Sequence, residues 1–109
     1  MDASDRLTTL LSMQRDNPGD PDLLFMIGNE YFQAGRHEDA LPWLASYVKA
    51  GADVGAAFGL IAACHFRAGD DPAARKALED GVAAALRSHH PTMAAEYRAQ
   101  LEDVDEESL

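Results

Sequence analysis

The sequence has few cysteines, few basic residues and no long apolar run. Its single cysteine, Cys64, allows no intramolecular disulfide framework. The start, Met-Asp-Ala-Ser-Asp, lacks the basic and apolar regions of a secretory signal, and no stretch approaches the length of a membrane span. These absences are typical of proteins of the reducing cytoplasm, so we predict a cytoplasmic location.

Basic residues are outnumbered about two to one. Nine Lys and Arg stand against 19 Asp and Glu, which gives a net charge of −10. A charge of this sign repels nucleic acids and anionic lipid surfaces, so we expect neither as a partner. Five acidic residues near the C-terminus have no basic residue among them, and we predict a disordered acidic tail at residues 105–109. The five are Glu102, Asp103, Asp105, Glu106 and Glu107.

The motifs that carry common enzyme chemistry are also missing. There is no Gly-rich phosphate loop and no His-Glu-x-x-His helix. No two of the four histidines, which are His37, His65, His89 and His90, have the i, i+4 spacing of a helical metal site, and Cys64 has no second sulfur nearby. We therefore expect no enzymatic activity, no cofactor and no metal.

The residues that are present favour one helical domain. Apolar residues make up 47% of the chain and are led by Ala and Leu, with few β-branched ones, which favours helices over strands. A length of 109 residues suits a single domain, which we place at residues 1–104.

An internal repeat of 34 residues organises this domain. Shifting the chain by 34 positions aligns residues 21–50 with residues 55–84 and gives eight identities, where chance gives about two or three at ordinary residue usage. The identical pairs are Ile27 and Ile61, Phe32 and Phe66, Ala34 and Ala68, Gly35 and Gly69, Ala40 and Ala74, Leu44 and Leu78, Val48 and Val82, and Ala50 and Ala84.

The first repeat, residues 21–54, is predicted to form two helices around Gly35. Gly35 supplies the left-handed position that ends the first helix. Pro42 lies inside the second helix and removes one backbone hydrogen bond, so we expect a local bend rather than a break. The residues expected to face inward are Leu24, Ile27, Gly28, Tyr31, Ala34, Ala40, Leu44, Tyr47 and Val48.

The second repeat, residues 55–88, has the same layout. Gly69 ends its first helix, and Asp71 is the predicted N-cap of the second, with Pro72 at the first helical position. We expect Cys64 to behave as a small buried apolar group. The residues expected to face inward are Phe58, Ile61, Ala62, His65, Ala74, Leu78, Gly81 and Val82.

One further helix flanks the repeats at each end. Residues 4–17 carry Leu7, Leu10, Leu11 and Met13 on one side, and a Pro- and Gly-rich segment at residues 17–21 then interrupts the chain. Residues 91–104 carry Met93, Tyr97, Leu101 and Val104 on one side. A stack of hairpins leaves an apolar face at each end, which these helices would cover.

These patterns resemble the tetratricopeptide repeat. Leu24-x-x-Ile27-Gly28-x-x-Tyr31, followed by Ala40-x-x-x-Leu44, is similar to the family signature Trp-x-x-Leu-Gly-x-x-Tyr with Ala-x-x-x-Phe. Phe58-x-x-Ile61-Ala62-x-x-His65 and Ala74-x-x-x-Leu78 match it less fully, and Ala52 stands where the family has a late Pro. The resemblance covers residues 4–88 and extends to short stand-alone bacterial members. It implies an all-α fold: an α-solenoid of two tetratricopeptide-type hairpins with one flanking helix at each end, about six helices in total.

The resemblance also implies a function. In this family the first helices of successive repeats line a concave groove that takes a peptide or helix of another protein, so the chain is expected to be a non-catalytic protein–protein interaction module. Three of the groove positions are phenylalanines, Phe25, Phe32 and Phe66, and the alternative is that these only pack neighbouring first helices together. The groove positions are Phe25, Asn29, Phe32 and Gln33 in the first repeat, and Ala63, Phe66 and Arg67 in the second.

Trp43 falls outside the inward stripe of its helix. It is either a partly covered residue on the shoulder of that helix or part of a second interface, because large aromatic residues are enriched at interfaces. If Trp43 is part of a second interface, an alternative function follows. The chain would then be a structural or assembly subunit that self-associates through an outer face. We expect a monomer or a weak homodimer.

Overall fold

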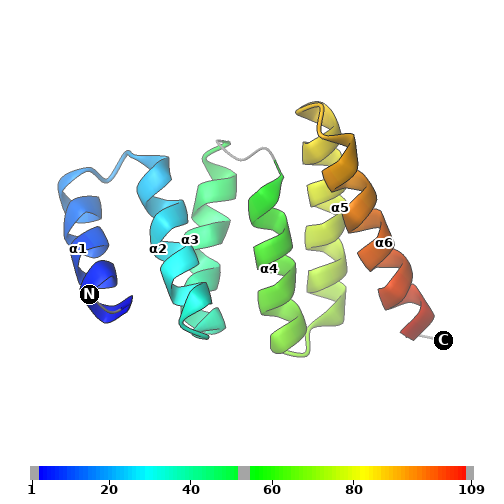
Figure 1. The fold of residues 1–109 in the computed structure, drawn as a ribbon, viewed down its shortest axis with the longest axis horizontal. Helices are drawn as coiled ribbons and strands as arrows, with labels where there is room; N and C mark the ends of the chain where they lie inside the picture. Colours follow the sequence, from blue (N-terminus) through cyan, green and yellow to red (C-terminus); the bar gives the residue numbers. More distant parts are fainter. Residues whose placement is uncertain (1–2, 52–54, 108–109) are drawn as a thin grey trace. The chain divides into compact units, whose positions relative to one another are not determined.

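A computed structural model of the chain describes residues 3–51 and 55–107. Every regular element in these ranges is an α-helix, so the predicted all-α class and the six helices are confirmed. Contacts between Cα atoms divide the chain into two compact units, Met1–Ala52 and Asp53–Leu109. The first unit contains α1 (Ala3–Asp16), α2 (Pro21–Gln33) and α3 (His37–Lys49); the second contains α4 (Ala56–Arg67), α5 (Asp71–Arg87) and α6 (Pro91–Glu107). Consecutive helices within each unit run in opposite directions (Figure 1).

In the first unit, α2 packs against both α1 and α3. Towards α3, Gly28 allows a close crossing, since a Cβ atom there would lie 2.8 Å from Cδ2 of Leu44. Towards α1, Leu23 and Ile27 are buried with Leu10. The sequence prediction placed Leu24 in the inward stripe and omitted Leu23, yet Leu23 is the more deeply buried of the two. The reason is that α2 buries two sides, whereas the predicted stripe described only one.

The turns that end α2, α4 and α5 share one hydrogen-bonding pattern. Gly35 and Gly69 have φ values of 78° and 77°, which confirms the predicted left-handed positions, and His89 takes φ 60° after α5. The next residue then donates its N–H to the carbonyl oxygen of the residue five positions earlier, a Schellman arrangement. These bonds run from Arg36 to Tyr31 at 2.9 Å, from Asp70 to His65 at 2.9 Å and from His90 to Ala85 at 2.8 Å.

Aspartate side chains cap the starts of α2 and α5. The side chain of Asp20 accepts a hydrogen bond from the N–H of Asp22 at 3.0 Å and caps α2. The side chain of Asp70 accepts one from the N–H of Ala73 at 3.2 Å, so Asp70 caps α5, and the predicted cap at Asp71 is wrong by one residue. Pro72 then lies in the second helical position, where a missing N–H also leaves no bond unmade. Inside α3, Pro42 does not break the helix, as expected.

In the second unit, α5 packs against both α4 and α6, and Tyr97 of α6 fills a space left by two glycines. A Cβ atom at Gly81 would lie 2.8 Å from the Tyr97 ring, and one at Gly59 would lie 3.0 Å from its hydroxyl oxygen. That hydroxyl donates to the carbonyl oxygen of Gly55 at 2.6 Å and accepts from the N–H of Gly59 at 3.2 Å. Tyr97 therefore joins α6 to the start of α4.

The last helix continues beyond its predicted end. α6 runs to Glu107 rather than to residue 104, so the predicted tail begins inside a helix. Asp105 forms an ion pair with Arg75 of α5, which gives the final turns of α6 a partner on the neighbouring helix. Residues 108 and 109 of the predicted tail lie outside the described residues, as do residues 52–54 at the end of the predicted first repeat. No helix in the described ranges is both long enough and apolar enough to cross a membrane.

Candidate functional site

The first unit contains a surface hollow between α1 and α2, with a volume of about 390 Å³. We call it the α1–α2 hollow. Its apolar side chains are Leu10, Phe25 and Met26, and its polar side chains are Arg6, Thr9, Asn29 and Glu30. Met26 is 47% exposed, which is unusual for a large apolar residue. The hollow therefore combines accessible apolar surface with a few polar groups, as binding sites commonly do.

Two of the predicted groove residues line this hollow. Phe25 and Asn29 are four residues apart on α2, so they lie on the same face of the helix. The Phe25 ring packs against the Tyr47 ring, with centroids 5.1 Å apart, which holds it in place. Asn29 is half-buried, and its side-chain amide makes no hydrogen bond to another described residue, so its donors and acceptor face the hollow without a partner.

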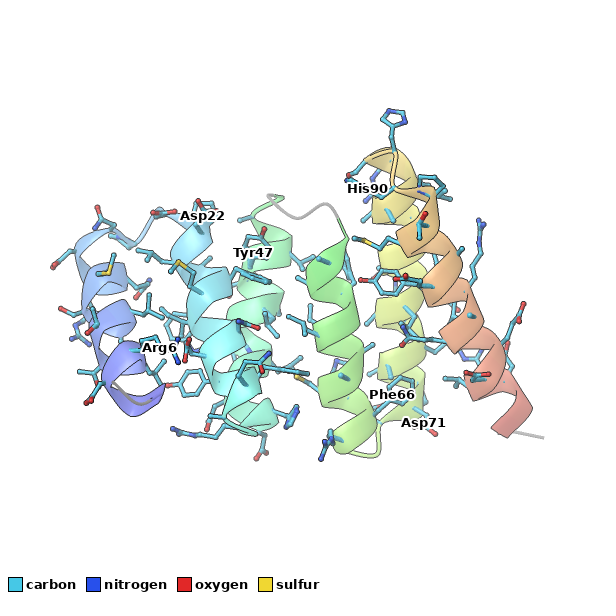
Figure 2. All side chains as sticks on the ribbon, in the orientation of Figure 1. Arg6, Asp22, Tyr47, Phe66, Asp71 and His90 are labelled. Atoms are coloured by element: carbon cyan, nitrogen blue, oxygen red, sulfur yellow. The ribbon has the colours of Figure 1, made fainter. Side chains whose placement is uncertain are left out.

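An ion pair joins α1 and α2 beside the hollow. Nε of Arg6 lies 3.6 Å from Oε1 of Glu30, which is too long for a hydrogen bond. The Glu30 side chain is only 15% exposed, whereas that of Arg6 is 59% exposed. Figure 2 shows Arg6 extending from α1 towards α2. The side chain of Glu30 is thus mostly buried, and that of its cationic partner is mostly exposed.

The other two predicted residues of α2 do not line the hollow. The Phe32 ring makes an edge-on contact with the ring of His37, with centroids 4.7 Å apart, at the turn into α3. Gln33 is the last residue of α2 and is exposed. The first repeat therefore brings together Phe25 and Asn29, while Phe32 and Gln33 lie towards the other end of the helix.

The sequence reasoning missed five residues of the α1–α2 hollow, which are Arg6, Thr9, Leu10, Met26 and Glu30. Two of them, Met26 and Glu30, directly follow the predicted positions 25 and 29, so a wider arc of α2 would have included them. The three on α1 have no such signal, because the way α1 docks on α2 depends on the conformation of the turn between them.

The second unit has its own hollow between α4 and α6, of about 310 Å³, which we call the α4–α6 hollow. It contains one predicted residue, Phe66, together with Gln100, Asp103 and Val104. Ala63 is half-buried and Arg67 is exposed, and neither lines this hollow. The continuous groove expected across both repeats stays a prediction.

The position of Trp43 agrees with the interpretation that it is a partly covered residue. Its side chain is half-buried and packs against the cluster of Leu10, Leu23 and Ile27. It therefore contributes to the core of the first unit as a partly covered residue. Its use as a second interface stays a prediction.

Two observations concern metal binding and the reactivity of Cys64. The described residues contain no group of three or more His, Cys, Asp or Glu side chains placed to hold a metal ion. Cys64 is 3% exposed, which confirms its predicted burial. Burial also raises the pKa of the Cys64 thiol by withholding water from the thiolate, which disfavours the nucleophilic form.

Comparison with known proteins gives one finding. A sequence profile described as tetratricopeptide repeat matches residues 1–54 and, in a second overlapping match, residues 25–90. The two matches together span α1 to α5 and most of the chain. Searches of curated proteins and of solved structures gave no significant match.

Proposed function

Because this chain belongs to the tetratricopeptide repeat family, whose helical hairpins generally mediate protein–protein interactions, we propose that it is a non-catalytic module that binds a peptide or helix of a partner protein. The observation that supports this most directly is the α1–α2 hollow. It places two predicted groove residues, Phe25 and Asn29, beside accessible apolar surface.

The residues of the hollow suggest how binding occurs. An apolar side chain of the partner contacts Leu10, Phe25 and Met26, and the flexible thioether of Met26 adapts to its shape. The amide of Asn29 donates to and accepts from the partner's backbone, which fixes its orientation. Neither interaction requires a reacting group.

The remaining predicted groove residues are proposed as further partner contacts, each within its own unit. In the first repeat these are Phe32 and Gln33, and in the second Ala63, Phe66 and Arg67. Phe66 has a hollow of its own against α6 and is the apolar anchor of the second repeat. Arg67 is exposed and free to contact a carboxylate or a backbone carbonyl of the partner.

The test is the binding of a captured partner to substituted chains. A partner is first isolated with the unaltered protein from an extract of the native organism, and its affinity is measured by titration calorimetry. We expect Asn29→Ala and Arg67→Ala each to weaken binding by about 1 kcal/mol or more, because few residues carry most of the binding energy. Ser46→Ala, at an exposed position of α3, serves as the control. Unchanged binding by the Asn29→Ala, Arg67→Ala double variant, with its helical circular dichroism intact, would contradict the proposal.

A second candidate function is self-association through an outer face. It is favoured, in the first unit, by Met13, which is 44% exposed and does not line the α1–α2 hollow. Size-exclusion chromatography with light scattering separates the two candidates. A monomer favours partner binding, whereas a dimer that persists on dilution favours self-association, and Trp43→Ala then tests whether that residue is at the interface.

A further inference from the structure

The ion pair beside the α1–α2 hollow indicates the chemistry of the partner segment. Glu30 carries its carboxylate on a mostly buried side chain at the edge of the hollow, where a cation at hydrogen-bond distance would stabilise the charge. Its one cation among the described residues is Arg6, held 3.6 Å away by a side chain that is itself largely in water. At this distance the carboxylate makes no hydrogen bond with Arg6, and it lies next to a space that can admit another cation.

We propose that the α1–α2 hollow takes a basic segment of a partner protein, with a Lys or Arg of that segment replacing Arg6 at Glu30. This rests on the proposed function, since it names the chemistry of the segment that the hollow binds. A large apolar side chain beside the partner's cation contacts Leu10, Phe25 and Met26, while the cation reaches Glu30 at hydrogen-bond distance.

Charge complementarity supports a basic partner over an acidic one. The whole chain carries a net charge of −10, and residues 1–52 contain eight acidic residues against four basic ones. This field attracts a basic segment and speeds its encounter with the surface, whereas it repels an acidic one. Arg6 alone, already beside a carboxylate, offers an acidic segment little attraction.

The exchange of cations is energetically reasonable. Arg6 is exposed and bound through one long contact, so moving it into water loses little. A cation from the partner gains a shorter, charge-assisted bond to a carboxylate whose side chain is already held mostly buried beside the hollow. Arg6 therefore competes with the partner's cation for Glu30, and removal of the Arg6 side chain strengthens binding of the basic segment.

The test uses three synthetic octapeptides with leucines at the same positions. They differ only in the residue next to the leucines, which is Lys in the first peptide, Gln in the second and Glu in the third. Each is titrated into the ¹⁵N-labelled full-length chain and followed by NMR. We expect the Lys peptide to bind most tightly and to shift the amide signals of residues 6, 9, 26, 29 and 30. We expect Arg6→Ala to lower its Kd by about threefold and Glu30→Gln to raise it by about threefold or more, the range of single partly exposed ion pairs.

Two control variants separate a local effect from a change in net charge. Arg15→Ala removes an exposed arginine of the same helix, and Glu38→Gln removes an exposed carboxylate of α3; neither residue lines the hollow. Both should alter Kd by less than their counterparts at positions 6 and 30. Arg6→Gln, which keeps a long polar side chain, repeats the Arg6→Ala test should that variant lose helical signal.

Three outcomes overturn the inference: tightest binding of the Glu peptide, no gain in affinity for the Arg6 variants beyond that of Arg15→Ala, or no binding of any peptide at millimolar concentration. Its failure is distinct from failure of the proposed function. A captured partner that depends on Asn29 but binds the Arg6 variants unchanged removes this inference alone. A chain that captures no partner and binds no peptide removes both.

Discussion

His89 holds a backbone conformation that both repeats assign to glycine. Its φ of 60° lies in the left-handed region, like those of Gly35 and Gly69 at the equivalent turns. A side chain costs roughly 1 kcal/mol or more there, because its Cβ crowds the following carbonyl oxygen. The turn forms all the same, since the N–H groups of His89 and His90 both bond back to α5.

We predict that His89→Gly stabilises the protein by about 0.5–1 kcal/mol. Glycine removes the steric strain, and the greater freedom it gives the unfolded chain offsets part of the gain. The measurement is the free energy of unfolding in urea. His90→Gly is the matched control, because His90 has no positive φ, and it should give no gain. Equal stability of His89→Gly and the parent would show that the left-handed turn is not strained.

Because of Cys64, the stability of the protein should vary with pH in the alkaline range. Burial raises the pKa of its thiol in the folded state above the unfolded value, which is about 8.5. The folded state therefore favours the neutral thiol. The stability associated with it is fully present below the unfolded pKa and is lost as the pH rises through the folded pKa.

We therefore predict that the free energy of unfolding of the parent protein and that of Cys64→Ala differ by a constant amount from about pH 6 to pH 8. Above about pH 8.5, the parent should lose stability relative to the variant. Urea unfolding under reducing conditions at each pH gives the two curves. Curves that stay parallel to pH 10 would mean that the thiol is not protected from ionisation by the fold.

At the scale of helices, the crossing of α2 and α3 depends on the absence of a side chain at Gly28. A Cβ atom there would lie 2.8 Å from both Cγ and Cδ2 of Leu44, a fully buried residue that has little room to move. Alanine is the better helix former by about 1 kcal/mol, so propensity and packing oppose each other at this position.

We predict that packing wins and that Gly28→Ala destabilises the protein by about 1–3 kcal/mol, the usual range for overpacking. Chemical denaturation provides the measurement. Gly19→Ala is the control, because a Cβ atom at Gly19 would meet nothing within 4 Å. A Gly28→Ala variant as stable as the parent would show that the two helices separate without loss.

The sequence allowed the helices to be predicted well and their docking less well. The repeat register placed Gly35, Gly69 and the buried pair Ala40 and Ala74 correctly, because helical period and turn chemistry are local properties. The burial of Leu23 and the later end of α6 were missed. Both depend on contacts with neighbouring helices, which a pattern within one helix does not reveal.

The residues of the candidate site were likewise predicted only in part. Phe25 and Asn29 were found because their spacing puts them on one face of α2. Arg6, Thr9 and Leu10 come from α1, whose orientation is set by the turn at residues 17–20. No periodicity in the sequence specifies that turn, so these three of the seven residues that line the α1–α2 hollow required the structure.

At the scale of the whole molecule, the excess of negative charge is mostly unpaired. Four ion pairs are found among the described residues, which join Arg6 to Glu30, Arg36 to Asp39, Arg75 to Asp105 and Lys76 to Asp80. All four involve at least one well-exposed side chain, so each contributes at most about 1 kcal/mol. With a net charge of −10, repulsion among the remaining acidic groups opposes folding.

We therefore predict that salt stabilises the protein. Raising NaCl from 10 mM to 1 M shortens the Debye length from about 30 Å to about 3 Å, which screens the repulsion between distant acidic groups more strongly than it weakens close pairs. The free energy of unfolding in urea at pH 7 should rise by roughly 1 kcal/mol, the size of one surface ion pair. The double variant Glu96→Gln, Glu102→Gln removes two exposed charges of α6 and should respond less to salt. A loss of stability on adding NaCl would instead mean that the ion pairs outweigh the repulsion, and that the acidic excess does not oppose folding.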